Sequence, residues 1–117
     1  MRTSDQNLNI SLKKEIETVL AQTLADLRDL NEAKIFLTDF FNESEFEAFS
    51  KRLAIAYWLK KGRSYNNIKD NLKVSSATIA TVQTMIEKPG FKLALKKAEA
   101  EEWANQWAER IKKIVRK

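Results

Sequence analysis

The chain has 117 residues, a net charge of +5, and neither cysteine nor histidine. Its length fits about one domain, and the missing residue types exclude disulfides, thiolate metal sites and imidazole catalysis. We therefore expect one domain over residues 1–117 that is not an enzyme and holds no metal or cofactor.

The N-terminal segment contains no apolar run of the signal-peptide type, and no stretch reaches the roughly 20 apolar residues of a membrane span. These features predict a cytoplasmic protein.

Charge is unevenly distributed along the chain. Residues 1–50 carry a net charge of −5, whereas residues 51–90 carry +6 and residues 91–117 carry +4. A basic stretch behind an acidic first half is typical of a protein that binds a polyanion. A solvated lysine-rich surface gives the same pattern, so charge alone leaves both interpretations open.

The pattern of apolar residues predicts an all-α protein of about six helices. Only two glycines and one proline occur, and no stretch shows sustained alternation of the strand type. Leucine, isoleucine and valine recur at three- and four-residue spacing over a first helix at about 11–29. A second helix at about 32–41 ends in an aromatic cluster that includes Phe36, Phe40 and Phe41.

A central helix is predicted over residues 42–62. Asn42 and Glu45 have the spacing of a capping box, which favours a helix start at this point. Residues 53–59, LAIAYWL, are apolar around the whole helix, so we expect them to be buried on all sides. Gly62 can end this helix in a left-handed conformation, and Ser64 can cap the next one.

Residues 64–87 have the pattern of a helix-turn-helix, in which two short helices meet at a steep angle. The side chains expected to point inward are Ile68, Leu72, Val74, Ile79 and Val82. The turn position that glycine often occupies is Lys73, and a left-handed residue with a Cβ costs on the order of 1 kcal/mol.

The outer side of the second short helix is crowded with small side chains. Small residues allow a helix to approach the major groove closely, and their hydroxyl and methyl groups can contact base edges. The predicted base contacts are Ser75, Ser76, Ala77, Thr78, Ala80, Thr81 and Thr84. The predicted phosphate contacts are Lys60, Lys61, Arg63, Lys69 and Lys73. The alternative is a poor helix that is held in place by packing.

Pro89 and Gly90 interrupt the chain before a final helix at about 91–117. Its apolar face includes Trp103 and Trp107, and it ends in a run of lysine and arginine. A basic amphipathic helix also fits a different function, a helical protein-interaction module that binds an acidic partner or a membrane surface. The role of this helix is left open.

Residues 42–82 resemble the Trp repressor family, on the KRLAIA core, the KGRSY corner and the SSATI helix start. The resemblance implies an intertwined homodimer in which residues 11–41 are dimerisation helices. It also implies that the helix-turn-helices of the two subunits enter successive major grooves of double-stranded DNA, and that the protein regulates transcription. It places Ala54 and Thr81 where the tryptophan-binding member has arginines, so we do not expect tryptophan to be the effector.

Overall fold

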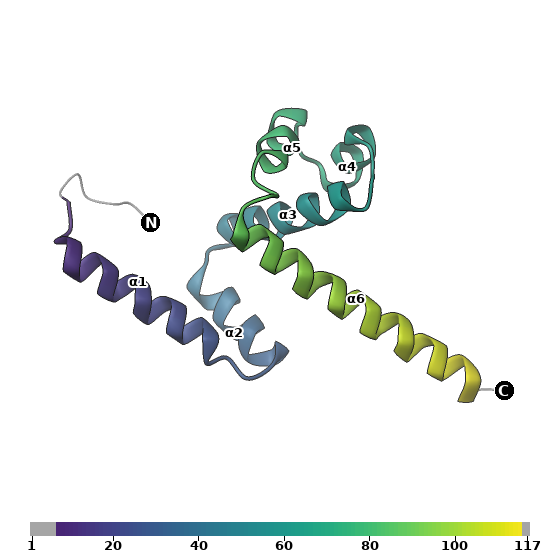
Figure 1. Ribbon diagram of the computed structural model, residues 1–117, viewed down its shortest axis with the longest axis horizontal. Helices are drawn as coiled ribbons and strands as arrows, with labels where there is room; N and C mark the ends of the chain where they lie inside the picture. Colours follow the sequence, from purple (N-terminus) through teal and green to yellow (C-terminus); the bar gives the residue numbers. More distant parts are fainter. Residues whose placement is uncertain (1–6, 116–117) are drawn as a thin grey trace. The chain divides into compact units, whose positions relative to one another are not determined.

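The computed structural model describes residues 7–115, with side chains described through residue 102 and at Asn105 and Glu109. This range contains no strand and six helices, which are α1 (Ile10–Ala25), α2 (Leu30–Phe40), α3 (Glu43–Lys60), α4 (Tyr65–Leu72), α5 (Ser76–Gln83) and α6 (Pro89–Val115) (Figure 1). The all-α prediction is confirmed. None of the described helices has the length and apolar character needed to cross a membrane.

Residue contacts divide the chain into two units, one up to Glu43 and one from Ser44 onward. In the first unit, the Asn9 side chain caps α1 by accepting hydrogen bonds from the backbone N–H groups of Ser11 and Leu12 at 2.9 and 3.3 Å. Helix α1 ends at Ala25, four residues before its predicted end. The reason is local, because the Asp29 carboxylate accepts the Glu32 N–H at 2.9 Å and thereby caps α2.

Glu32 reinforces the start of α2. Its carboxylate accepts hydrogen bonds from the Arg28 guanidinium at 2.6 and 2.8 Å and from the Arg28 backbone N–H at 3.0 Å. The guanidinium, and after it the backbone N–H, lowers the pKa of Glu32. The chain is thus held in a fixed turn between α1 and α2.

The first unit exposes its apolar side chains. No residue of α1 or α2 is buried. The apolar stripe of α1 is between 43 and 59% exposed at Leu12, Ile16, Val19, Leu20 and Leu24. In α2 the rings of Phe36 and Phe40 stack with centroids 4.7 Å apart, yet Phe40 is still 62% exposed. Contiguous apolar faces of this kind mark surfaces that another element or chain covers.

The second unit contains the hydrophobic core. Its buried residues are Ile55 and Ala56 from α3, Ile68 from α4, Ile79 and Val82 from α5, and Leu95 from α6. Half-buried side chains that include Trp58, Tyr65 and Phe91 pack around them. Four helices therefore share one small core, which fixes α4 and α5 against α3.

The prediction that residues 53–59 are buried on all sides is wrong. Ile55 and Ala56 are buried, but Leu53 is 40% exposed and Tyr57, Trp58 and Leu59 are half-buried. The physical reason is that α4, α5 and α6 supply core residues to one side of α3. The other side carries the exposed Phe49 and Leu53, at a spacing of four residues that places them on one face of the helix.

Helix α6 begins at Pro89, two residues before the predicted start. Proline is favoured in the first helical turn because its missing N–H would have no partner there, so Pro89 starts the helix and does not merely interrupt the chain. Figure 1 shows α6 continuing well beyond the group formed by α3, α4 and α5. Its first turns, with Phe91 and Leu95, are the part that packs on the core.

Candidate nucleic-acid interface

Helices α4 and α5 form a helix-turn-helix whose turn is fixed by local hydrogen bonds. The Ser64 hydroxyl accepts the Asn67 N–H at 3.1 Å, so the predicted cap of α4 is present, and the Ser75 hydroxyl caps α5 by accepting the Thr78 N–H at 3.1 Å. Lys73 lies between the helices with φ 56° and ψ 51°. It is the left-handed residue that the sequence predicted, and its N–H donates to the Lys69 carbonyl at 3.0 Å.

The inward positions agree with the sequence pattern. Ile68, Ile79 and Val82 are buried, and Leu72 and Val74 are half-buried against the same core. The Tyr65 hydroxyl also donates a hydrogen bond to the Gln83 side-chain carbonyl, which ties the start of α4 to the end of α5. These contacts fix the angle between the two short helices, and so the direction in which α5 presents its outer side.

The outer side of α5 is exposed. All seven predicted base contacts, Ser75, Ser76, Ala77, Thr78, Ala80, Thr81 and Thr84, are exposed. Two hydroxyls bond to the backbone of this segment, since Thr81 donates to the Ala77 carbonyl at 3.0 Å and Thr84 donates to the Thr81 carbonyl at 2.6 Å. Because all seven residues are serine, alanine or threonine, no long side chain projects from this surface.

Thr78 differs from the other six. It lies on the side of α5 that faces α3, and it helps to line a cavity of about 350 Å³ together with Ser44, Glu47, Ala48, Lys51, Arg52, Ile55, Val74 and Val82. Its hydroxyl is 2.9 Å from the Ser75 hydroxyl. Ser75 is the N-cap and precedes the helix. We therefore define the reading face of α5 as the remaining five residues, Ser76, Ala77, Ala80, Thr81 and Thr84.

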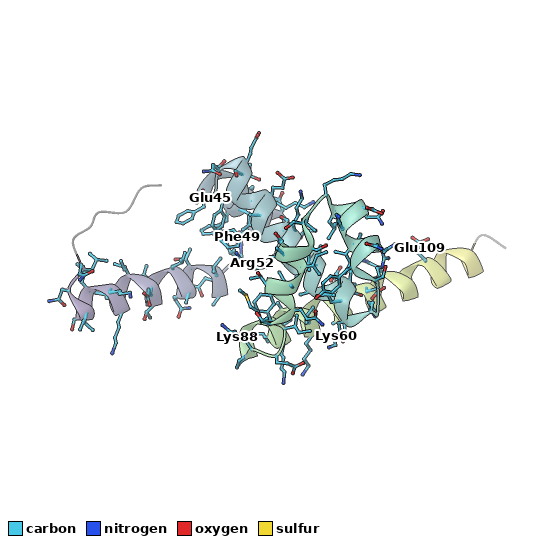
Figure 2. All side chains as sticks on the ribbon, turned by 90° about the horizontal axis from the view of Figure 1, so that it is seen from above. Glu45, Phe49, Arg52, Lys60, Lys88 and Glu109 are labelled. Carbon is cyan, nitrogen blue, oxygen red and sulfur yellow. The ribbon has the colours of Figure 1, made fainter. Side chains whose placement is uncertain are left out.

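The same cavity bears on the two positions where the resemblance places arginines in the tryptophan-binding member. Here these positions are Ala54 and Thr81, and neither residue lines the cavity. Arg52 does, and its guanidinium also lies 5.1 Å from the centroid of the Phe49 ring (Figure 2). The cavity wall thus contains an arginine from α3, whereas α5 contributes only Thr78 and Val82.

The five cations predicted to contact phosphates fall into two groups. Lys69 and Lys73 are exposed and form no ion pair with any described residue. The other three are engaged within the protein. The Arg63 guanidinium stacks 4.1 Å from the centroid of the Trp58 ring, and its Nη1 donates to the Asn67 side chain at 3.4 Å.

Lys60 and Lys61 form ion pairs with α6. Lys60 Nζ is 3.1 Å from a carboxylate oxygen of Glu99, and Lys61 Nζ is 3.3 Å from a carboxylate oxygen of Glu102. All four side chains are between 38 and 49% exposed. Pairs with this exposure typically contribute only about 0.2–1 kcal/mol to stability. Figure 2 shows Lys60 at the end of α3 that lies beside α6.

The sequence did not predict the ion pairs of Lys60 and Lys61 or the contact of Arg63 with Trp58. Lys60 and Glu99 are far apart in the chain, and no spacing rule connects them. Arg63 follows Trp58 by five residues across the end of α3, so helical periodicity did not predict their contact. The side chains of Trp103, Trp107 and the terminal lysine and arginine run lie outside the described residues.

Residues 15–99 match the model of a protein family described as Trp repressor protein. An uncharacterized protein of Bacillus subtilis, YerC, is 31% identical over 70 residues, which are 60% of this chain and 66% of that protein, just under two thirds of its length. The crystal structure of a TrpR-like protein from Eubacterium eligens superposes with a TM-score of 0.69 at 28% identity. That superposition covers 78% of this chain and 96% of the other.

Proposed function

The chain belongs to the Trp repressor family, and from this membership and the exposed reading face we propose that it is a dimeric, sequence-preferring regulator of transcription that binds double-stranded DNA. It acts in the cytoplasm and has no catalytic activity. The proposal is carried by one observation above the others. The reading face of α5 is open to solvent and lies on a helix-turn-helix whose two unpaired lysines, Lys69 and Lys73, are available to phosphates.

The chemistry of the reading face suits contact with base edges. The methyl groups of Ala77 and Ala80 can contact the thymine methyl, and the hydroxyls of Ser76 and Thr81 can bond to bases in the major groove. No arginine, asparagine or lysine stands on this face to make a bidentate base contact. Sequence preference is therefore moderate and depends in part on bridging water and on DNA shape.

The dimer is supported by apolar side chains that are exposed in the single chain. In the first unit these are the stripe of α1 and the ring of Phe40, and in the second they are Phe49 and Leu53 of α3. We expect a second copy of the chain to cover these side chains, because symmetric homodimers are the commonest protein assemblies. A dimer presents two copies of α5, which contact half-sites about one helical turn apart, roughly 34 Å.

Selection of bound fragments from random double-stranded DNA tests this function. We expect enriched fragments to share a palindrome whose half-sites are separated by about one helical turn. The matched control is the Thr81→Glu variant, which places a carboxylate on the reading face. Enrichment of the same fragments by that variant, or no enrichment by the natural chain, would exclude α5 as the reading helix.

A further inference from the structure

Two of the lysines nearest to the start of the helix-turn-helix are bound by carboxylates of the same chain. Lys60 is the last residue of α3 and Lys61 directly follows it, only four and three residues before the Ser64 cap of α4. Their ammonium groups bind Glu99 and Glu102, which lie three residues apart on one face of α6. A lysine that binds a carboxylate cannot bind a phosphate with the same geometry without breaking the first pair.

We propose that Glu99 and Glu102 set the affinity for DNA by holding Lys60 and Lys61 away from the phosphate backbone. This inference rests on the proposed function. It makes the two glutamates affinity-setting residues that need not touch DNA themselves. DNA phosphates must displace the two glutamate carboxylates before Lys60 and Lys61 can contact the DNA backbone. Part of the positive charge of the second unit is therefore not available for DNA binding.

The position of α6 does not depend on these ion pairs. Leu95 is 2% exposed and Phe91 packs on the same core, so apolar contacts hold the first turns of the helix. The ion pairs are half-exposed, which is the setting in which a salt bridge adds little to folding and can be exchanged for another anion. Their removal should therefore free the lysines and leave α6 in place.

Glu102 also lies beyond the segment that identifies the family. The match to the Trp repressor family model ends at residue 99, whereas α6 continues to Val115. The second ion pair is therefore formed by a part of α6 that the family match does not include. The long final helix, whose role the sequence left open, gains a function within the same binding reaction.

The test compares three variants of the full chain. Glu99→Gln/Glu102→Gln removes both ion pairs and Glu102→Gln removes one, while Glu101→Gln is the matched control. Glu101 is exposed on the same helix and forms no ion pair with a described residue. The control thus changes the net charge as Glu102→Gln does, without releasing a lysine.

Affinity for a selected palindromic duplex is measured between 50 and 200 mM salt. Over roughly this range, the slope of log K against log salt reports the number of phosphates that the protein neutralises. Each freed lysine that neutralises one phosphate steepens the slope of log K against log salt by about 0.9, and a dimer has two copies of each. We expect the double variant to be steeper by up to about 3.6 and to bind at least ~10-fold tighter near 0.1 M salt. Glu102→Gln should show about half the change in slope, and Glu101→Gln should match the natural chain.

Removal of the lysines completes the test. Lys60→Gln/Lys61→Gln should weaken DNA binding by less than about 3-fold in the natural chain, yet it should cancel the whole gain in the Glu99→Gln/Glu102→Gln background. Equal behaviour of Glu101→Gln and Glu102→Gln, or a full loss on removal of the lysines from the natural chain, would overturn the inference and leave the proposed function standing. No salt-dependent DNA binding by any variant would overturn the proposed function, and the inference with it.

Discussion

Replacement of Thr81 by glutamate should weaken DNA binding at least ~10-fold without disturbing the fold. Thr81 is exposed on the reading face, and its hydroxyl bonds only to the Ala77 carbonyl of its own helix, at 3.0 Å. A carboxylate there would lie near DNA phosphates. At a separation of about 5 Å, the repulsion is about 0.8 kcal/mol at the dielectric constant of water and about 3 kcal/mol at an effective value of 20.

A dimer has two such residues, so the loss of binding free energy is about 1.5–7 kcal/mol, or at least a ~10-fold weaker affinity. Stability should change by no more than about 0.5 kcal/mol, because the side chain is exposed and glutamate favours helix at least as well as threonine. The change in affinity is measured by fluorescence anisotropy on a labelled palindromic duplex. Thermal melting followed by circular dichroism measures the change in stability.

Two controls separate charge from other effects. Thr81→Gln has nearly the same shape without the charge, so the difference between it and Thr81→Glu isolates the repulsion. Thr18→Glu makes the same substitution at an exposed threonine of α1 whose hydroxyl also bonds to its own helix, at the Lys14 carbonyl. By helical spacing, Thr18 lies nearly opposite the apolar stripe of α1. Affinity of Thr81→Glu within about 3-fold of Thr81→Gln would refute the placement of DNA against α5.

Three further outcomes are expected. Lys73→Gly should stabilise the fold by up to about 1 kcal/mol in urea denaturation, because it relieves the left-handed residue at φ 56°. The same change should weaken DNA binding through the lost cation, and tighter binding would count against a phosphate contact there. L-Tryptophan at millimolar concentration should alter neither the melting temperature nor DNA affinity, whereas a clear stabilisation would identify it as a ligand of the folded state. Ending the chain after Glu102 should preserve DNA binding, since Leu95 and both ion pairs to α3 are kept. Loss of all polyanion binding by that shortened chain, if it still melts cooperatively, would favour the interaction-module alternative.

The sequence predicted features whose causes lie within a few residues. The Ser64 cap and the left-handed Lys73 depend on neighbours three or four positions away, and both are present in the structure. The exposure of Leu53 could not be predicted from its apolar run, because it depends on which sides of α3 the other helices cover. The pairing of Lys60 with Glu99 likewise depends on the path of α6, which no local pattern encodes.

In the candidate site, too, the sequence predicts features set by nearby residues but not those set by the packing of distant helices. The small residues of α5 and the inward set around Ile68 and Ile79 follow from helical spacing. Thr78 and Arg52 both line the cavity. Their positions there follow from the angle between α3 and α5, which no local sequence pattern encodes.

The salt dependence of DNA affinity tests the central claim most directly. The proposed dimer would carry two copies each of the unpaired lysines Lys69 and Lys73, four cations in all, so we predict a slope of log K against log salt of about −3.6 or steeper. Affinity for the selected palindrome should then fall at least ~100-fold between 50 and 200 mM salt. A slope near zero would show that phosphates are not the partners of these cations, and would contradict DNA binding through the helix-turn-helix.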